Sequence, residues 1–250
     1  RSYFYKQTTN NKQDNRKRKS KSEIKIDSWD IGHRGNVTSV QYFYYLGVDM
    51  SRALSGACCS QQCDVVDWLL SVSTPLLDNI LIHPCKNGNL ALIHKLIQEG
   101  ANLGPTSNFS LSTSNSNSSS STSRLNFRKE TNEFPFLTAC RYGHKDIVLQ
   151  LYIYGADIHQ CDLTGCNGVS VAFNNRHFDI VELLLSMGVK PLADRCGWTP
   201  LHLACLYNSP QLVQLVLQYS QEHTNCRTNQ GILPQDLTND PQIKLSLNLI

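Results

Sequence analysis

Aliphatic residues recur along this chain in short stripes that have the spacing of an α-helix. Ile147, Val148 and Leu151 form one stripe, and Ile180 and Val181 repeat its start 33 positions later. Because positions three and four apart lie on one face of a helix, each stripe predicts a short amphipathic helix. One pair of such helices cannot bury its apolar face alone. The pattern therefore predicts an array in which successive helix pairs cover one another.

One phrase recurs within this array: a pair of small residues, a short turn, two aliphatic pairs and then a small residue, often Gly. The clearest copy contains Thr-Pro-Leu-His-Leu-Ala-Cys at 199–205, with Gly197 and Trp198 before it and aliphatic residues at 212–217. This copy closely resembles the ankyrin repeat, including its Thr-Pro-Leu-His-x-Ala signature and its period of about 33 residues. The resemblance implies an all-α fold, an ankyrin-repeat solenoid of stacked helix hairpins.

Other copies keep the register but lack the signature. In five copies a turn residue is followed twelve positions later by a small residue: Gly35 with Gly47, Gly88 with Gly100, Gly143 with Gly155, Arg176 with Gly188, and Asn208 with Ser220. A copy without these glycines contains Ala57 and Cys58, and a shortened copy starts at Gly231 and is expected to cap the stack. The copies together predict about six to seven stacked hairpins.

Several residues of the phrase have a physical reason to be there. Pro200 suits the first turn of a helix, where its missing N–H has no intrahelical partner. Ala139 and Ala204 allow neighbouring helices to approach closely. Gly143 stands at a helix end, where a left-handed backbone favours Gly. Arg176 takes the same position in the next copy and adopts that backbone less readily, so its repeat fits the pattern least well.

Two polar segments divide the chain. Residues 1–25 hold nine Lys and Arg against two acidic residues, which leaves 14 basic and 18 acidic residues for the remainder. Such a polar, basic segment predicts a disordered tail, and the Ser/Asn-rich stretch at 103–133 predicts a flexible insertion. We therefore expect degenerate N-terminal repeats over 26–102, and C-terminal repeats with a cap over 134–250.

Each polar segment has a functional interpretation and a plainer one. The run Arg16 to Lys19 in the tail is typical of a nuclear-import signal or a nucleic-acid contact, although a solvated linker beside a folded domain is the plainer interpretation. The hydroxyl groups of the insertion suggest a phosphorylated regulatory loop. The insertion either divides the array or leaves it continuous, and we expect one continuous superhelix.

The ten cysteines are best explained as reduced, packed thiols. Four of them occupy the second position of the small-residue pair, where a compact apolar side chain fits: Cys58, Cys85, Cys140 and Cys205. A zinc site built on Cys59 with Cys63, or on Cys161 with Cys166, lacks the tight Cys-x-x-Cys pairs of structural zinc sites. We therefore expect no metal and no other cofactor.

The chain lacks the sequence motifs of an active site. It has no Gly-x-x-x-x-Gly-Lys phosphate loop, no Gly-x-Ser-x-Gly elbow and no His-Glu-x-x-His zinc helix. His144, His177 and His202 lie where the ankyrin pattern itself has His, so local hydrogen bonds at helix starts are expected to explain them. These observations favour a protein that is not an enzyme and has no small-molecule substrate.

The resemblance to ankyrin repeats implies a concave surface that binds another protein. Carried onto this chain, the surface comprises the two residues after each small pair together with the hairpin tips. These are Arg141, Tyr142, Asn174, Asn175, Leu206 and Tyr207, with tips at Leu163, Thr164, Arg195 and Trp198. They vary between copies, as a recognition surface should, although exposed surface without a partner is the plainer interpretation for any one of them.

The expected function is thus a non-catalytic protein-interaction scaffold or adaptor module in the cytoplasm. No apolar stretch approaches the roughly 18 to 20 residues that span a bilayer, so no membrane partner is expected. The alternative is a nuclear regulator that uses the basic tail for import or for contact with nucleic acid.

Overall fold

A computed structural model describes residues 27–50, 52–72, 79–103 and 134–248 of the 250-residue chain. The described residues form thirteen α-helices and two 3-10 helices, and their one β-type pairing is an isolated bridge between Cys161 and Asn167. The all-α class predicted from the sequence is confirmed. The predicted tail at 1–25 and residues 104–133 of the predicted insertion lie outside the described residues, so disorder and regulation there stay predictions.

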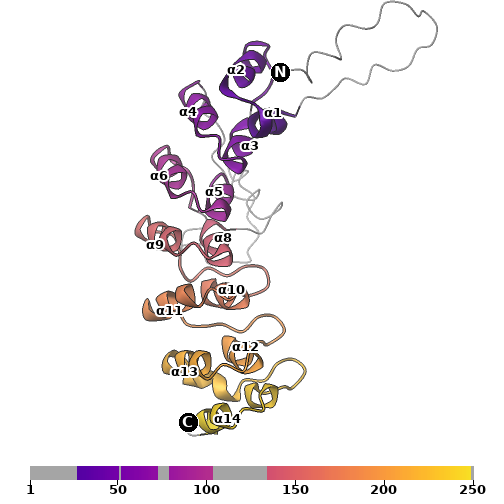
Figure 1. Ribbon diagram of the computed structural model, residues 1–250, viewed down its shortest axis with the longest axis vertical. Coiled ribbons are helices and arrows are strands. Elements are labelled where there is room, and N and C mark those ends of the chain that lie inside the picture. Colours follow the sequence, from indigo (N-terminus) through magenta and orange to yellow (C-terminus); the bar gives the residue numbers. More distant parts are fainter. Residues whose placement is uncertain (1–26, 51, 73–78, 104–133, 249–250) are drawn as a thin grey trace, which may run out of the picture.

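The helices form two parallel rows along an elongated, gently curved stack (Figure 1). The inner row consists of α1 Ser28–Arg34, α3 Ala53–Cys59, α5 Ile82–Asn87, α8 Pro135–Tyr142, α10 Gly168–Asn174 and α12 Pro200–Leu206. The outer row consists of α2 Val37–Tyr45, α4 Cys63–Val72, α6 Leu90–Gln98, α9 Lys145–Ile153, α11 Phe178–Ser186 and α13 Pro210–Tyr219. Each inner helix pairs with the outer helix that follows it, so the described residues contain six hairpins, in the predicted range.

The shortened last copy closes the stack as two reduced elements. After η1 Gln221–Asn225, its first helix is only the 3-10 turn η2 Pro234–Leu237, which packs on α12, and its second is α14 Pro241–Asn248, which packs on α13. The side chain of Thr238 ties this end to the preceding repeat, because its hydroxyl donates to Oδ1 of Asn208 at 2.6 Å. The end of the stack is therefore hydrogen-bonded as well as packed.

Polar caps fix where the helices begin. Thr199 caps α12, and the backbone N–H of Thr199 in turn donates to Nδ1 of His202, which completes a capping box with Pro200 in the first helical turn. Asn89 caps α6 and Asn167 caps α10 in a similar way, each side-chain oxygen accepting a backbone N–H. The start of α12 at Pro200 is as predicted.

Small side chains let the inner helices approach one another, as predicted. Ala139 and Ala204 are completely buried, and so are the four cysteines that follow the small residue in their repeats. Burial raises the pKa of the Cys58 and Cys205 thiols to about 12, so they remain neutral and act as apolar packing groups.

The turns between the paired helices mostly have the predicted left-handed backbone. Gly88 and Gly143 have φ values of 76° and 81°, and Asn208 has 51°. Gln61 has 59° and supplies the turn of the copy without glycines. Gly35, the turn residue of the first copy, differs, because its φ of −78° is extended.

His144 and His177, which follow these turns, join neighbouring repeats, which corrects the expectation of local hydrogen bonds for them. His202 makes the expected local bond with Thr199. Nε2 of His144 donates to the carbonyl of Lys86, and Nε2 of His177 donates to the carbonyl of Arg141, each at 3.0 Å. These contacts also explain the glycines: a Cβ on Gly143 would lie 2.5 Å from the ring of His177. Glycine is required there by the next repeat as well as by its own φ.

The same contact explains how Arg176 can replace glycine. Its φ is 64°, so the left-handed turn is kept despite the side chain. The position in the following repeat that corresponds to His177 is Ser209, which has no ring to occupy the space beside the turn. The repeat that fitted the pattern least well is therefore built like the others.

The stack is continuous across the insertion, as expected. Helix α5 packs on α8, although residues 104–133 separate them in the sequence. Nδ1 of His94 also hydrogen-bonds the hydroxyl of Tyr154 at 2.6 Å, which joins α6 to the outer row beyond the insertion. Figure 1 shows both rows continuing without a break at this point.

Candidate partner-binding face

The candidate site is the surface formed by the ends of the inner helices, the turns that follow them and the finger loops between repeats. We call it the inner face. It contains the ten residues proposed from the sequence. Of these, Tyr142, Leu163, Thr164, Asn174, Asn175, Arg195 and Leu206 are exposed, and Arg141, Trp198 and Tyr207 are half-buried. All ten therefore reach the surface of the described chain.

Arg141 and Tyr142, at the end of α8, make contacts with two neighbouring repeats. Nη2 of Arg141 lies 3.9 Å from Oδ2 of Asp162 in the next finger loop. Nζ of Lys86, at the end of α5, lies 5.4 Å from the centre of the Tyr142 ring. These contacts hold both side chains at the boundary between repeats, where each repeat contributes to a surface shared with the next.

Tyr207, at the end of α12, repeats this arrangement two repeats further on. The guanidinium carbon of Arg176 lies 5.0 Å from the centre of its ring, and the ring of Phe173 lies parallel to it at 6.2 Å. Phe173 is completely buried, so Tyr207 connects the core to the surface. A guanidinium beside an aromatic ring is attracted by the ring's quadrupole, which holds Arg176 in place.

The remaining helix-end residues are less constrained. The side-chain amide of Asn175 donates to the carbonyl of Val171 at 2.8 Å, within its own helix. Leu206 is 50% exposed, which is a large fraction for an apolar side chain between two repeats. The exposed side chain of Leu206 can contact a partner without breaking a contact of the fold.

Three finger loops extend beside the inner helices and are joined to one another. Asp162 organises the first finger: its Oδ1 accepts the backbone N–H groups of Thr164 and Cys166. The fingers then bond to each other, because the N–H of Arg195 donates to the carbonyl of Thr164, and the N–H of Asn229 to that of Cys196, both at 2.9 Å. The tips are therefore held at a fixed spacing.

The predicted tip residues divide into two groups. Leu163, Thr164 and Arg195 lie at the turns of their fingers, as predicted. Trp198 does not, because it lies at the base of the second finger, where its backbone N–H donates to Oδ1 of Asp194. Its ring lies 5.7 Å from the ring of the buried His202, so part of its role is to pack against the start of α12.

Two residues of the inner face were missed by the sequence reasoning. Lys86 follows Cys85 in the same way that Arg141 follows Cys140, so the register of the copies contained the signal that could have found it. Arg176 was recognised only as an imperfect turn residue. Both are exposed, and each contacts a tyrosine of the following repeat.

The described residues contain no group of three or more His, Cys, Asp or Glu side chains placed to hold a metal ion. In that same part of the chain, no helix has the length and apolar character needed to cross a membrane.

Comparison with known proteins agrees with this geometry. A family model for ankyrin repeats, in three copies, matches residues 136–228. The fold matches that of the human ASB11 ankyrin repeat domain, with a TM-score of 0.64 over 89% of this chain and 96% of that chain, at 18% sequence identity. Residues 136–228 are ankyrin repeats, and the described chain has the fold of an ankyrin repeat domain. Ankyrin repeats generally mediate contacts between proteins and are generally non-catalytic.

Three curated relatives contain sequence similar to this ankyrin-repeat chain. A protein of Acanthamoeba polyphaga mimivirus, named as ankyrin repeat protein L271, is 25% identical over 92% of this chain and 34% of its own length. The tyrosine-protein kinase HTK16 of Hydra vulgaris is 27% identical over 70% of this chain and 22% of its own length. A fowlpox virus protein, named as ankyrin repeat protein FPV031, is 31% identical over 45% of this chain and 36% of its own length. The chain thus spans about a third or less of the length of these relatives.

Proposed function

We propose that this chain is a non-catalytic interaction module that binds a partner protein through the inner face. The observation that carries the proposal is the pair of tyrosines at the repeat boundaries. Tyr142 and Tyr207 each remain at the surface while a cation of the preceding repeat contacts the ring. Tyrosine and arginine are the side chains most often found at interface hot spots, because they offer large contact areas and directed hydrogen bonds.

Rigidity of the surface supports the same proposal. The inter-repeat bonds of His144 and His177 fix the helix ends, and the backbone bonds between fingers fix the tips. A surface that is ordered before binding loses less conformational entropy when a partner docks. The chain therefore needs no chemistry of its own to act, since its contribution is a shaped surface with varied side chains.

The test compares two triple variants of the full chain. The first replaces Tyr142, Asn175 and Tyr207 with alanine on the inner face. The control replaces Tyr152, Ile153 and Tyr219, which are exposed residues of the outer row. Each is used as bait in a cross-linking pull-down from native lysate, after circular dichroism has shown that its helix content is unchanged.

The proposal predicts that the inner variant recovers at least about tenfold less partner, since hot-spot losses of about 2 kcal/mol are common. The control variant should recover as much partner as the unmodified chain. Equal recovery by the inner variant, or a loss confined to the outer variant, would contradict the proposal.

The alternative of a nuclear regulator rests on residues 1–25, which lie outside the described residues, and it stays a prediction. Its test is binding to duplex DNA at increasing salt. A nucleic-acid contact through the tail should weaken steeply with salt, and deletion of 1–25 should abolish it.

A further inference from the structure

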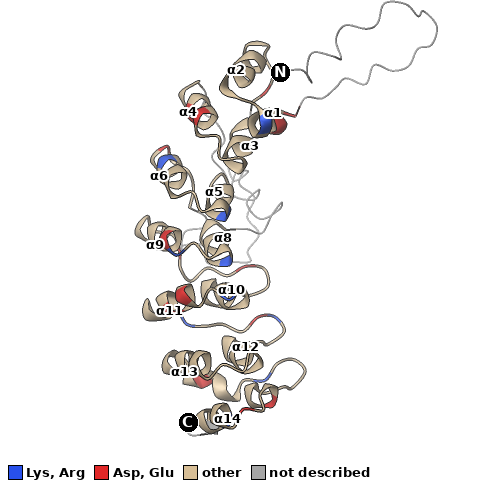
Figure 2. Cartoon of the chain, in the orientation of Figure 1, with Lys and Arg blue, Asp and Glu red and all other residues tan. Residues whose placement is uncertain are grey.

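The charged residues of the stack are separated between its two rows. The inner helices and the turns that follow them carry four basic residues and one acidic residue: Arg34, Lys86, Arg141 and Arg176, with Asp30. The outer helices with their caps carry six acidic residues and two basic ones: Asp64, Asp67, Glu99, Asp146, Asp179 and Glu182, with Lys95 and Lys145. Figure 2 shows acidic residues on α4, α9 and α11 and basic residues at the ends of α5 and α8.

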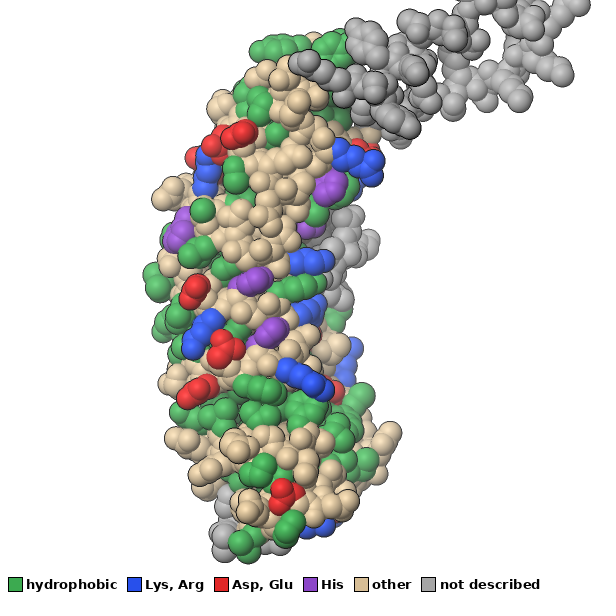
Figure 3. Space-filling view, in the orientation of Figure 1, with side chains coloured by type: hydrophobic (Ala, Val, Ile, Leu, Met, Phe, Trp, Pro, Cys, Tyr) green, Lys and Arg blue, Asp and Glu red, His purple; other side chains and the backbone are tan. Residues whose placement is uncertain are grey.

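Three of the inner cations lie on successive inner helices. Lys86 ends α5, Arg141 ends α8 and Arg176 follows α10, so a single row of positive charge crosses three repeats. Figure 3 shows basic side chains recurring along one side of this face, beside histidines. Neighbouring helices pack about 8 to 10 Å apart. A peptide in the extended polyproline II conformation has three residues per turn and rises about 3.1 Å per residue, so every third side chain lies on one face and advances by about one such step.

The cations at the two ends of this row are available to a ligand. Within the described residues, the side chain of Lys86 contacts the ring of Tyr142, and the side chain of Arg176 contacts the ring of Tyr207. An aromatic ring attracts a cation without neutralising it, and a guanidinium held over a ring still offers N–H donors at its edge to a carboxylate. Arg141 differs, because it already lies close to Asp162.

Arg176 has the strongest claim to a binding role. It adopts a left-handed backbone, with a φ of 64°, which costs a non-glycine residue about 1 kcal/mol or more relative to glycine. The left-handed turn itself does not require this side chain, since glycine serves at the equivalent turns at 88 and 143. A backbone conformation that disfavours arginine, in a turn that places its guanidinium on the surface, points to a use outside the fold.

We propose that the inner face binds an extended acidic segment of a partner protein, with Asp or Glu side chains at about every third position opposite Lys86, Arg141 and Arg176. This inference rests on the proposed function and adds the chemical class of the partner. Three cations are few for nucleic acid, whose binding depends on many phosphate contacts.

The experiment selects ligands from a phage library of random twelve-residue peptides on the full chain. The selected peptides are then synthesised, and their affinity is measured by fluorescence polarisation. Four proteins are compared: the unmodified chain, Arg176→Gly, Lys86→Ala, and Lys145→Ala as an exposed outer-row control. A twelve-nucleotide oligothymidylate is titrated in parallel. Arg176→Gly should fold at least as stably as the unmodified chain, because glycine suits the turn.

The proposal predicts selected peptides enriched in Asp and Glu at intervals of about three. Their affinity should fall at least about fivefold with Arg176→Gly and about threefold with Lys86→Ala, should not change with Lys145→Ala, and should weaken as salt rises. Peptides without acidic enrichment, or acidic peptides insensitive to Arg176→Gly and Lys86→Ala, would overturn it. If oligothymidylate binds more tightly than the peptides, and if its binding is lost with Arg176→Gly, the proposal would be overturned in favour of a nucleic-acid ligand.

These outcomes separate the inference from the proposed function. Selected peptides that lack acidic residues, yet lose binding when Tyr142 and Tyr207 are replaced, would leave the inner face as a binding surface and reject only the acidic partner. Peptides that bind regardless of every inner-face substitution would reject both.

Discussion

The first two repeats and the last two stack in the same solenoid, but different contacts hold them together. Helices α1 and α3 meet backbone to backbone: a Cβ on Gly32 would lie 1.8 Å from the carbonyl oxygen of Ala53, and one on Gly56 would lie 2.2 Å from that of Trp29. Helix α10 has its own glycine, Gly168, but a Cβ there would meet only side-chain atoms, the nearest at 3.0 Å. Close backbone approach therefore characterises the N-terminal end.

At the C-terminal end, polar bonds to the finger loops join the repeats. His202 is completely buried, receives a hydrogen bond from Thr199 and donates to the carbonyl of Ile232 in the next finger. Ser170 makes the equivalent bond to the carbonyl of Leu192 one repeat earlier. The comparison teaches that the helix stack does not depend on one consensus set of contacts, since glycine packing at one end substitutes for the finger bonds at the other.

The largest expected effect is that of adding a methyl group at the N-terminal contact. Gly32→Ala should force α1 and α3 apart and cost about 3 kcal/mol or more of unfolding free energy, because the obstacle is backbone rather than a movable side chain. Hydrogen exchange should show lost protection over 27–72 and little change over 134–248. Gly47→Ala is the control: its Cβ enters open space, so only the strain at φ 76° remains, about 1 kcal/mol. Equal costs for both variants would refute the close-approach account.

The next effect belongs to the other end of the stack. His202→Ala should cost about 2 to 3 kcal/mol, because it removes the capping box and leaves the Ile232 carbonyl without its donor. Urea unfolding followed by hydrogen exchange should place the loss in 190–248. A variant as stable as the unmodified chain would show that the finger bond contributes nothing.

The same histidine predicts how stability depends on pH. Desolvation lowers the pKa of His202 below its ordinary value near 6.5, and that of His223 in the same direction. Because the pKa is lower in the folded state than in the unfolded state, folding favours the neutral imidazole. The contribution of this imidazole to the unfolding free energy is therefore complete above about pH 6.5 and is lost as pH falls through the lowered pKa. The stability of the C-terminal repeats should therefore fall as pH drops below about 6.5, and His202→Gln should reduce that slope. A slope unchanged by His202→Gln would contradict the assignment.

A smaller effect tests the bond between repeats. His177→Ala should cost about 1 kcal/mol, the usual net value of one hydrogen bond. Gly143→Ala should reduce the unfolding free energy more in the unmodified chain than in the His177→Ala variant, because that variant lacks the ring that the new methyl group would meet. A double-mutant cycle by urea unfolding measures this difference. Strictly additive costs would mean that the ring does not restrict the turn.

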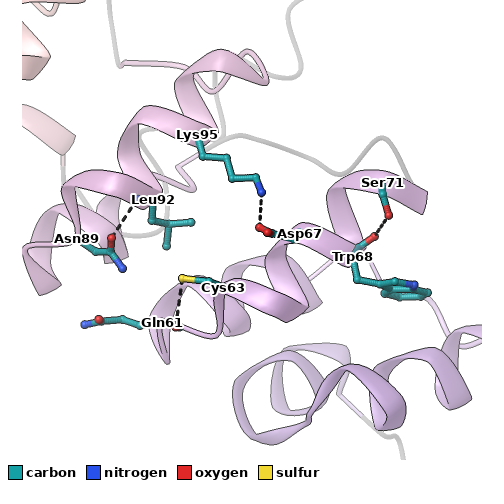
Figure 4. Close-up of polar contacts among 8 residues, drawn as sticks. All are labelled: Gln61, Cys63, Asp67, Trp68, Ser71, Asn89, Leu92 and Lys95. Carbon is teal, nitrogen blue, oxygen red and sulfur yellow. Dashed lines mark hydrogen bonds and ion pairs between the residues drawn. The ribbon is translucent and has the colours of Figure 1, made fainter.

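The smallest expected effect concerns an ion pair in the outer row. Lys95 of α6 pairs with Asp67 of α4, and both side chains are substantially exposed (Figure 4). Solvent and salt screen such a pair, so Asp67→Asn should change the unfolding free energy by about 0.5 kcal/mol or less. A loss above about 1.5 kcal/mol in urea unfolding would show that the N-terminal repeats depend on this pair and not on their glycine contact.

The sequence predicted the features that repeat within one hairpin and missed those that depend on how hairpins stack. Ala139, Cys140 and Pro200 recur at fixed positions of the repeat, so their register was enough to place them. The bonds of His177 reach a carbonyl 36 positions away, a relation that follows only from the rise between repeats. Gly32 gave no signal because the first repeat lacks the consensus residues around it.

The candidate site shows the same division. Helix-end residues such as Tyr142 and Tyr207 could be proposed from the register, because each follows a buried small pair. The cations that contact them come from the preceding repeat and could not be paired with them from the sequence alone. Arg176 shows this most clearly, since its departure from the turn consensus looked like a defect until its position beside Tyr207 was seen.

The central claim is that partners dock on the inner face and not on the outer row. Tyr142 and Tyr219 test it directly, because they are the same residue type, each is 40% exposed, and they belong to the inner and outer rows. A photo-crosslinking benzophenone side chain is placed at each position in turn, and the chain is irradiated in native lysate. The account predicts a protein cross-link at position 142 that is absent at 219. Cross-links at 219 alone, or of equal yield at both positions, would contradict it.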